Sequence, residues 1–347
     1  MEPQVKQTSE REAFYRKIDG AHLSALWNVM GALITPEPKS GCQPFLWRFD
    51  TVKDYMMEAG SLITAKEAER RVLILENPGL RGQSKITTSL YAGIQLVMPG
   101  EVAPAHRHSQ SALRFVLEGS GAYTSVDGVR TVMEPGDFVI TPTMTWHDHG
   151  NPSTEPMLWL DCLDIPVVQF FDASFSERHE ADEQPITRPA GDSYARFGHN
   201  LLPVGLARAA KTSPVFNYPY RGTRAALERM KARDEWDACQ GLKLRYTNPV
   251  TGDYAMPTIG TFIQLLPKGF KTSRYRSTDA TVFVPVEGRG RTRIGDQVFE
   301  WGPKDVFVAP SWHWVTHEAD DEAVLFSCSD RPVQEKLDLF REDRGNA

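Results

Sequence analysis

The chain has 347 residues, of which 41% are hydrophobic and 24% are charged, and its formal net charge is −6. This composition is typical of a globular protein with one large domain or two ordinary ones. The sequence has no Lys/Arg-rich run and no apolar stretch of membrane-spanning length, so we expect neither nucleic acid nor a membrane as a partner.

The first twenty residues, MEPQVKQTSEREAFYRKIDG, lack the apolar core of a signal peptide, which favours a cytoplasmic protein. The four cysteines are widely separated and form no CxxC pair, so we expect buried free thiols rather than a disulfide framework. They are Cys42, Cys162, Cys239 and Cys328.

Residues 1–75 are predicted to form a helical N-terminal region. Ser9 is a candidate helix cap, and Thr64 with Glu67 matches the Thr-x-x-Glu capping box. From about Thr87, short apolar runs alternate with Gly, Pro and Asp-Gly, a pattern typical of β-hairpins. With the apolar run from Met157 to Phe171, these strands define a first β unit at residues 76–171.

Residues 172–250 are predicted to be a connector, because their first part is rich in Asp, Glu and Pro. The segment TRAALERMKAR, residues 223–233, is expected to be a short helix within it. The strand pattern returns near Thr258 and defines a second β unit at residues 251–335.

The second β unit repeats the first, which indicates an internal duplication. The segment that starts at Gln95 aligns without a gap with the segment that starts at Gln264, and both carry Gly and Glu-Gly at the same offsets. After a shift of one residue, the Trp and His of TWHDHGN also find counterparts. The matched pairs are Gly100 and Gly269, Glu118 and Glu287, Trp146 and Trp314, and His149 and His317.

Two pairs of histidines in the first unit are candidate metal ligands. His106 and His108 are two residues apart, as are His147 and His149, and side chains at this spacing on a strand share one face. If the two strands are neighbours, four imidazoles converge, and imidazole suits Fe, Zn, Cu and Ni. Four ligands would close the site, whereas three would leave positions for a substrate, and the residues alone do not decide between these arrangements.

The motifs around these histidines resemble the two cupin motifs. In the first motif a glutamate ligand is common, and that position is Ala112 here. The matching residues are Gly100, His106, His108 and Gly119 in the first motif, and Gly136, Pro142, His147 and Asn151 in the second. The resemblance implies a mainly β bicupin fold: two double-stranded β-helix (jelly-roll) barrels with a helical N-terminal lead.

The chain also resembles a narrower family over nearly its whole length. PAHRHSQSALRFVLEG, TPTMTWHDHGN, WLDCLDIP and AERRVLILENPGL are similar to segments of the bicupin gentisate 1,2-dioxygenase family, which includes salicylate and 1-hydroxy-2-naphthoate dioxygenases. This resemblance implies one Fe(II) per chain, held by His106, His108 and His147, that opens an aromatic ring with O2. It also implies a homotetramer.

The family resemblance extends to the substrate pocket. It implies that the substrate is a small aromatic 2-hydroxycarboxylate, that Arg114 binds its carboxylate, and that His149 acts beside the metal. We expect Arg114 to share the histidines' face because eight residues separate it from His106, although an ion pair with Asp161 or Glu118 is the structural alternative. The further substrate-binding candidates are Arg70 (in preference to Arg71), Gln95, Asp161, Trp159, Tyr91 and Gly93.

The second unit departs from the metal pattern, because Tyr275, Ser277 and Val315 replace the three ligands; we therefore expect its barrel to be metal-free. Gentisate, cleaved to maleylpyruvate, is the leading substrate. Met144 and Cys162 depart from the family pattern and keep salicylate, substituted salicylates such as 5-nitrosalicylate, and 1-hydroxy-2-naphthoate as alternatives. A non-catalytic metal-binding or storage bicupin and a Zn- or Mn-dependent isomerase are the alternatives from other classes.

Overall fold

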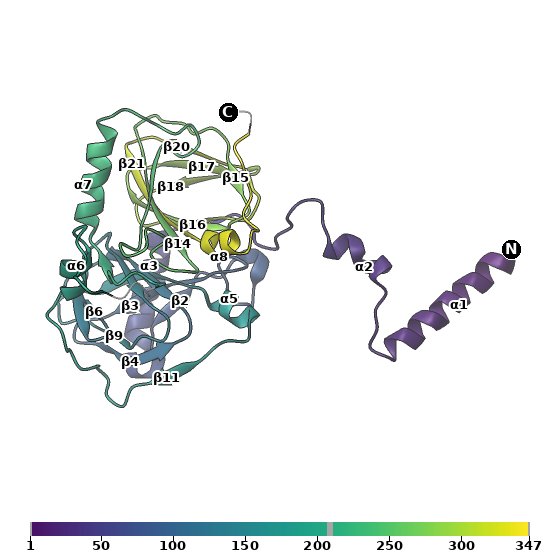
Figure 1. Cartoon of the computed structure of the whole chain (residues 1–347), viewed down its shortest axis with the longest axis horizontal. Coiled ribbons are helices and arrows are strands. Elements are labelled where there is room, and N and C mark those ends of the chain that lie inside the picture. Colours follow the sequence, from purple (N-terminus) through teal and green to yellow (C-terminus); the bar gives the residue numbers. More distant parts are fainter. Residues whose placement is uncertain (1, 207–210, 346–347) are drawn as a thin grey trace. The chain divides into compact units, whose positions relative to one another are not determined.

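The computed structural model describes residues 2–206 and 211–345, apart from the side chains of residues 2–7, 65 and 66. The chain divides into two compact units, Met1–Lys39 and Ser40–Ala347, and the second unit contains both barrels (Figure 1). The described helices include none that is both long enough and apolar enough to cross a membrane.

The first unit consists of α1 (Glu2–Asp19) and α2 (Leu26–Leu33). The indole Nε1 of Trp27 donates a hydrogen bond to the Tyr15 hydroxyl at 3.1 Å, which connects the two helices. Ser9 lies inside α1, so the predicted helix cap there is wrong. The helix starts earlier because Pro3 is compatible with a first helical turn.

The N-terminal barrel consists of a six-stranded antiparallel sheet, β12-β8-β5-β10-β3-β2, and a five-stranded one, β11-β4-β9-β6-β7. Between β6 and β7, Asp127 and Gly128 have φ of +47° and +76°, as a two-residue hairpin turn requires, so the Asp-Gly hairpin prediction is confirmed. The strands are β2 (Val72–Ile74), β3 (Tyr91–Val97), β4 (Val102–His108), β5 (Ala112–Glu118), β6 (Tyr123–Val126), β7 (Val129–Val132), β8 (Phe138–Thr141), β9 (His147–Gly150), β10 (Met157–Leu163), β11 (Ser176–Arg178) and β12 (Asn217–Tyr218).

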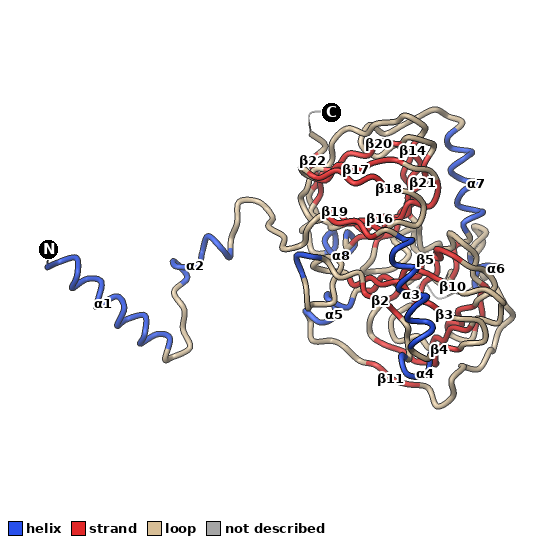
Figure 2. Tube along the Cα trace, turned by 180° about the vertical axis from the view of Figure 1, so that it is seen from behind, coloured by secondary structure: helices blue, strands red, loops and turns tan. Residues whose placement is uncertain are grey.

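The C-terminal barrel repeats this arrangement, which confirms the bicupin prediction (Figure 2). Its six-stranded sheet has the order β1-β19-β16-β21-β14-β13, and the opposite sheets are β18-β17-β20 and β15-β22. The strands are β1 (Phe45–Trp47), β13 (Leu242–Arg245), β14 (Gly260–Leu266), β15 (Arg276–Ser277), β16 (Thr281–Glu287), β17 (Gly290–Ile294), β18 (Gln297–Trp301), β19 (Val306–Ala309), β20 (Val315–Ala319), β21 (Ala323–Ser329) and β22 (Glu342–Asp343).

In each barrel, both edge strands of the six-stranded sheet come from outside the predicted β unit: β2 and β12 in the first barrel, β1 and β13 in the second. β1, from the N-terminal region, pairs with β19 of the C-terminal barrel, and β12, from the connector, pairs with β8 of the N-terminal barrel. The predicted helical region 1–75 thus also contributes β1 and β2, whose Phe-Leu-Trp and Val-Leu-Ile runs favour strands. Its remaining helices are α3 (Phe49–Leu62) and α4 (Ala65–Ala68), and the Thr64 side chain caps α4 at Glu67 N, 3.2 Å away, as predicted.

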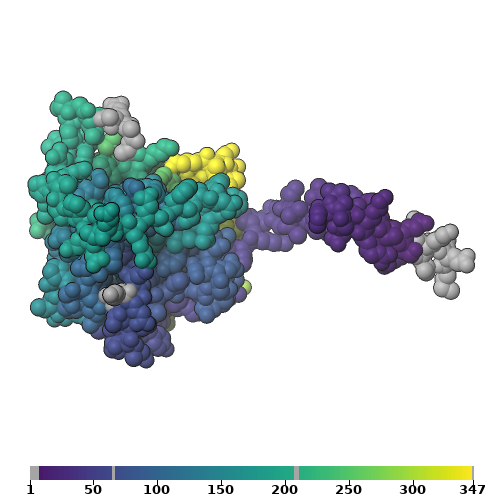
Figure 3. Space-filling view, turned by 90° about the horizontal axis from the view of Figure 1, so that it is seen from below, coloured from purple at the N-terminus to yellow at the C-terminus, as the bar shows by residue number. Residues whose placement is uncertain are grey.

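The connector packs on the outside of the N-terminal barrel, where its atoms (teal in Figure 3) lie on the molecular surface. The amide of Ala105 donates to the carbonyl of Asp182 at 2.8 Å, and β11 pairs with β4. The predicted helix 223–233 is α7 (Tyr220–Lys231), which begins directly after Pro219; the connector also contains α6 (Asp192–Phe197).

The two barrels repeat one further feature that the sequence analysis missed. The run Met157–Phe171 is predicted as strand, but its end forms α5 (Ile165–Phe170), because Pro166 cannot donate to a strand ladder. The same Asp-x-Pro-Val sequence starts α8 (Arg331–Lys336) in the second barrel. Asp164 accepts from Ser111 N at 2.9 Å, and its counterpart Asp330 accepts from Ala280 N at 3.1 Å.

The central strands of both barrels are buried on both faces because the six-stranded sheets pack against each other. The Phe115 ring on β5 stacks on the Phe326 ring on β21, with centroids 4.1 Å apart. The sulfur atoms of Cys162 and Cys328 lie 3.4 Å apart at the same junction, and all four cysteines are buried free thiols, as predicted.

Candidate metal centre and active site

Three histidines converge inside the N-terminal barrel. His106 and His108 lie at the end of β4, and His147 starts β9, directly opposite His106 in the strand register. One ligand atom from each of the three lies within 4.8 Å of the others, and within the described residues this is the one such group of three or more potential ligands. The ring centroids of His106 and His147 are 4.2 Å apart.

Backbone carbonyls lie beside the Nδ1 atoms of all three imidazoles and fix the proton position on two of them, His108 and His147. The Nδ1 atoms of His106, His108 and His147 lie 3.2, 2.8 and 2.9 Å from the carbonyl oxygens of Pro104, Gln110 and Thr145. The Nδ1 of His106 also contacts Arg70 Nη2, which only donates, so the carbonyl alone does not fix the tautomer of that ring. Because a carbonyl oxygen only accepts, Nδ1 of His108 and of His147 carries the proton and Nε2 keeps its lone pair. This is the protonation state that a metal-binding histidine needs, and the three lone pairs fit one metal ion.

The surroundings keep these imidazoles neutral. Burial lowers the pKa of His106 to about 3 and that of His108 to about 4, and the positive charge of Arg70 adds to the effect on His106. Burial also holds the pKa of His147 far below its usual range. Ala112, at the position where many cupins carry a glutamate ligand, is buried and supplies no charge. The candidate ligand set is therefore three neutral nitrogens.

His149 lies on β9 next to the triad and is fully buried. Its ring centroid is 5.8 Å from that of His147, and its Nε2 has no hydrogen-bond partner within the described residues. Its Nδ1 lies 3.0 Å from the hydroxyl of Thr124, which donates to the sulfur of Met133 at 3.3 Å. Because the Thr124 proton points to sulfur, the hydroxyl accepts from Nδ1–H, which leaves a lone pair on Nε2.

Arg114 is buried on β5, and its guanidinium faces the barrel interior. Its Nη1 donates to the Thr141 hydroxyl at 2.7 Å, and its Nε lies 3.5 Å from Asp161 Oδ1 without an aligned hydrogen bond. The even-spacing argument for this position is wrong, because the strand breaks between His108 and Ala112; Arg114 belongs to the opposite sheet. Its charge nevertheless acts on all four histidines.

The ion pair with Asp161 therefore exists, but it does not use every donor of the guanidinium. Asp161 also accepts from the indole Nε1 of Trp159 at 3.1 Å. Burial raises the pKa of Asp161 to about 6, against the opposing effect of the Arg114 charge. The carboxylate is thus charged at neutral pH but is close to its titration range.

Arg70 and Arg71 point to different places. Arg70 Nη2 contacts the His106 ring and donates to the Pro104 carbonyl at 2.9 Å. Arg71 is buried in an ion pair with Glu101 at 2.8 Å and also donates to the carbonyl of Ile63. Arg70 is thus the arginine beside the triad, and burial lowers its pKa to about 10.

The remaining predicted pocket residues lie on one face of β3 and β10. Gln95 is opposite Trp159, and Gly93 is opposite Asp161, in the strand register. A Cβ added to Gly93 would lie 2.5 Å from Val72 Cγ1 and 3.3 Å from the hydroxyl oxygen of Tyr91, so this position requires glycine. Burial raises the pKa of Tyr91 well above its ordinary value, so its hydroxyl stays protonated.

The two departures from the family pattern lie in different places. Cys162 alternates with Asp161 on β10 and contacts Cys328 of the other barrel, so its side chain points away from the histidines. Met144 lies in the loop before β9, where its amide donates to the His108 carbonyl at 2.7 Å. Its side chain is 36% exposed.

Thr124, Thr141 and Met133 also contact the site and were not predicted from the sequence. One signal was available: Thr124 and His149 are 25 residues apart, and so are their counterparts Thr292 and His317 in the second barrel. In the alignment of the two halves with the one-residue shift, Thr124 matches Thr292 and His149 matches His317. The equal spacing could therefore have predicted a Thr–His contact in both halves. The carbonyls that orient the imidazoles carry no side-chain signal and were not predictable.

The fold and the three-histidine group define a cupin with a candidate metal site. A family model described as a cupin domain matches residues 93–163. The chain is 62% identical over 337 residues to gentisate 1,2 dioxygenase 1 of Aquipseudomonas alcaligenes, with 97% of each protein covered. It is 35% identical to 5-aminosalicylate 1,2-dioxygenase of Comamonas sp, over 96% of this chain and 90% of that protein.

A solved structure agrees with these relatives. Salicylate 1,2-dioxygenase from Pseudoaminobacter salicylatoxidans, as adducts with gentisate, matches with a TM-score of 0.91 at 34% identity, covering 97% of this chain and 94% of that one. The chain belongs to the gentisate 1,2-dioxygenase family. The sequence-based prediction of a ring-cleaving dioxygenase is therefore confirmed.

Proposed function

We propose that this chain is an Fe(II)-dependent dioxygenase that opens gentisate between its carboxyl-bearing and hydroxyl-bearing carbons, giving maleylpyruvate. The observation that carries the proposal is the convergence of three neutral imidazole lone pairs without a ligand carboxylate. His106, His108 and His147 would hold the iron, one ion per chain. When bound, iron supplies a template for the substrate oxygens and for O2, and it activates O2.

The charge balance around the triad favours an anionic substrate. Two guanidinium groups, Arg70 and Arg114, act on the histidines, whereas Asp161 is the carboxylate whose charge acts on both arginines. With the charge of a divalent metal added, the interior carries an excess of positive charge. A substrate carboxylate offsets this excess, and Arg114 is the planar donor that orients it.

His149 completes the site as a proton acceptor. Its Nε2 lone pair is buried, has no described hydrogen-bond partner and belongs to the ring next to His147. A hydroxyl group of a 2-hydroxycarboxylate next to this atom can donate its proton to the imidazole. Trp159 packs against the His149 ring at 5.6 Å, edge to face, and holds the orientation of Asp161. Thr124 fixes the tautomer, so it is a positioning residue.

The choice of gentisate depends on the relatives. The relative at 62% identity is a gentisate dioxygenase, and the solved salicylate dioxygenase forms adducts with gentisate, so gentisate fits this family's pocket. Tyr91 and Gly93 lie side by side on β3 and define the wall where the substrate ring would pack. Salicylate, 5-nitrosalicylate and 1-hydroxy-2-naphthoate are the alternatives, with the same chemistry.

The test is oxygen uptake by the Fe(II)-loaded protein with these four acids in parallel, with product spectra. Dominant uptake with gentisate, matched by one O2 per ring opened, supports the proposal. Dominant uptake with another acid keeps the reaction and replaces the substrate. Bound iron without uptake for any acid refutes the proposal and favours a non-catalytic bicupin.

We also propose that the chain forms a homotetramer in the cytoplasm. An apolar groove of about 600 Å³ next to α5 and α8 is lined in part by Val167, Phe171, Val333 and Leu337, and the Phe170 ring beside it is 80% exposed. Exposed apolar side chains gathered along a groove are typical of an interface. Four unbonded thiols fit a reducing compartment. Light scattering on the purified protein, whose chain mass is 39.0 kDa, tests the assembly.

A further inference from the structure

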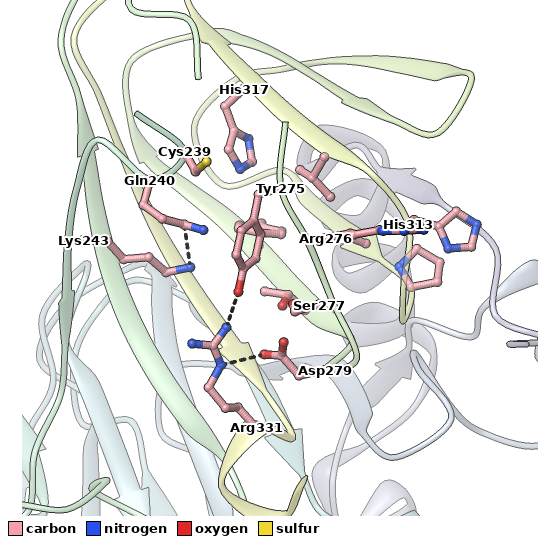
Figure 4. A pocket seen from close by; sticks show the side chains of 15 residues that line it. Cys239, Gln240, Lys243, Tyr275, Arg276, Ser277, Asp279, His313, His317 and Arg331 are labelled. Carbon is pink, nitrogen blue, oxygen red and sulfur yellow. Dashed lines mark hydrogen bonds and ion pairs between the residues drawn. The ribbon is translucent and has the colours of Figure 1, made fainter. Parts of the chain in front are cut away.

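The C-terminal barrel contains a small cavity at the position that corresponds to the metal site. Tyr275 pairs with Val315 there, as His106 pairs with His147 in the first barrel. The cavity has a volume of about 30 Å³. Figure 4 shows its polar lining: the Tyr275 ring lies in the centre, His317 on one side of it, Arg331 and Asp279 on the other, and Lys243 with Gln240 alongside.

This cavity keeps one feature of the first barrel although the metal ligands are gone. The hydroxyl of Thr292 lies 2.8 Å from His317 Nδ1, as the hydroxyl of Thr124 lies 3.0 Å from His149 Nδ1. Thr292 and His317 are both buried. Because this barrel lacks the other imidazoles, the pair is not part of a three-histidine site like that of the first barrel.

The hydrogen-bond chain behind this histidine runs in the opposite direction. In the first barrel Met133, which can only accept, takes the proton of the Thr124 hydroxyl. Its counterpart in the repeat is Trp301, which can only donate, and its Nε1 donates to Thr292 Oγ1 at 2.8 Å. The Thr292 proton is then free to be donated to His317 Nδ1.

The two histidines therefore have opposite polarity. His149 presents a lone pair at Nε2, whereas His317 presents an N–H group, and His317 lines the C-terminal cavity. Burial, with a smaller effect from the Lys243 charge, lowers the pKa of His317 to about 3, so the ring is a neutral donor. A neutral imidazole that donates into a cavity is suited to an acceptor ligand.

Lys243 supplies a positive charge to the same cavity. Its ammonium donates to Gln240 Oε1 at 3.2 Å, and within the described residues it forms no ion pair. The lining carboxylate, Asp279, is paired with Arg331 at 3.3 Å. Burial, followed by the Arg331 charge, lowers the pKa of Lys243 to about 8, which leaves it largely charged at neutral pH. A partly buried ammonium in this setting is stabilised by a counter-ion.

We propose that the C-terminal barrel binds a small monovalent anion, chloride or formate in size, held by the Lys243 ammonium and the His317 Nε2–H. The cavity has room for about two water molecules, so an ion of up to three non-hydrogen atoms fits and a gentisate molecule does not. The anion compensates the Lys243 charge and links β13 to β20 inside the barrel.

Thermal unfolding in chloride-free buffer at pH 7, with sodium chloride or sodium formate added, is the first test. Ionic strength is held constant with sodium sulfate, whose divalent anion is too large for the cavity. We expect the wild-type Tm to rise by roughly 2 °C for each tenfold increase in anion concentration above the Kd. Chloride alone would assign a halide site, and formate alone a carboxylate site. No response to either overturns the proposal.

Two lysine variants locate the effect. Lys243→Met is expected to abolish the anion-dependent rise in Tm and to be at least as stable as the wild type without anion. Lys268→Met is the matched control, because Lys268 is 77% exposed on the same barrel, and it should keep the full rise. Equal anion responses in both variants overturn the assignment to Lys243.

Diffraction provides a direct measurement that needs no variant. Crystals grown without chloride and soaked in sodium bromide should show an anomalous peak in contact with Lys243 and His317. If this peak is absent at a bromide concentration that raises the Tm, the proposal is overturned. Oxygen uptake by Lys243→Met distinguishes this site from the proposed function, because Lys243 lies outside the active site and the variant should retain the wild-type rate.

Discussion

The substitution Arg114→Met tests the proposed site most directly. It removes a buried guanidinium but keeps an unbranched apolar side chain in its place. Arg114 contacts Thr141 and Asp161 and none of the three metal-ligand candidates by hydrogen bond, so the metal content should not change. Losing a buried partner of a substrate carboxylate costs about 2–5 kcal/mol. This corresponds to a loss of roughly 30- to 4,000-fold in kcat/KM.

The same substitution should make stability depend on pH through Asp161. The folded-state pKa of Asp161 is raised to about 6, above the unfolded value of about 3.9. In the wild type, ionisation of Asp161 therefore lowers the free energy of unfolding as the pH rises from about 3.9 to about 6, and this loss is constant above pH 6. Without the Arg114 charge, the pKa of Asp161 rises further. The variant should then lose about 1.4 kcal/mol of stability, relative to the wild type, for each pH unit above 6 until the new pKa is reached.

The assays are iron content, kcat/KM for gentisate, and urea unfolding between pH 5 and 8. Asp161→Asn in the same background should remove the additional pH dependence. Arg291→Met is the matched control, because the Arg291 side chain is 44% exposed on the second barrel and should affect none of these quantities. Loss of iron from Arg114→Met, or unchanged turnover, would refute the assigned function of the guanidinium.

Five further substitutions test other contacts. His106→Ala should reduce bound iron and oxygen uptake to background, measured by metal analysis and an oxygen electrode. Thr124→Val removes the acceptor of His149 Nδ1–H, so kcat should fall about tenfold with iron retained and with an altered pH–rate profile. Cys162→Ala should leave gentisate kinetics unchanged, since the thiol faces Cys328. Phe326→Ala should lower the free energy of unfolding in urea by about 3–5 kcal/mol and should also lower kcat/KM. Phe283→Ala, inside the second barrel, should lower the free energy of unfolding by a similar amount without changing kcat/KM.

The metal ligands and the duplication could be predicted because strand geometry constrains residue spacing. The period of two puts His106 and His108 on one face in any regular strand, and the Gln, Gly and Glu-Gly offsets survive because strands and turns have fixed lengths. The Asp127-Gly128 turn was predictable for the same local reason.

Features that depend on long-range pairing were not predictable. β1 is a three-residue strand whose partner β19 lies more than 250 residues away, and nothing in Phe45–Trp47 specifies that partner. Arg114 illustrates a related problem: the spacing argument assumed one continuous strand, but a turn at Ser109–Ser111 places the arginine on the other sheet. Met133 accepts a hydrogen bond from Thr124, whereas its counterpart Trp301 donates one to Thr292. This difference in direction depends on three-dimensional contacts that the sequence alone does not specify.

The second barrel supports the active site although it lacks the ligands. Alternation along β5 and β10 places Arg114 and Asp161 toward the histidines and Phe115 and Cys162 toward the other barrel. The face of β5 and β10 that carries the buried ion pair contributes little hydrophobic stabilisation. The register of these strands therefore depends on packing of their opposite face. The stack of Phe115 on Phe326 provides that packing. The second barrel therefore supports the active site through packing, although it lacks the three histidines of the first.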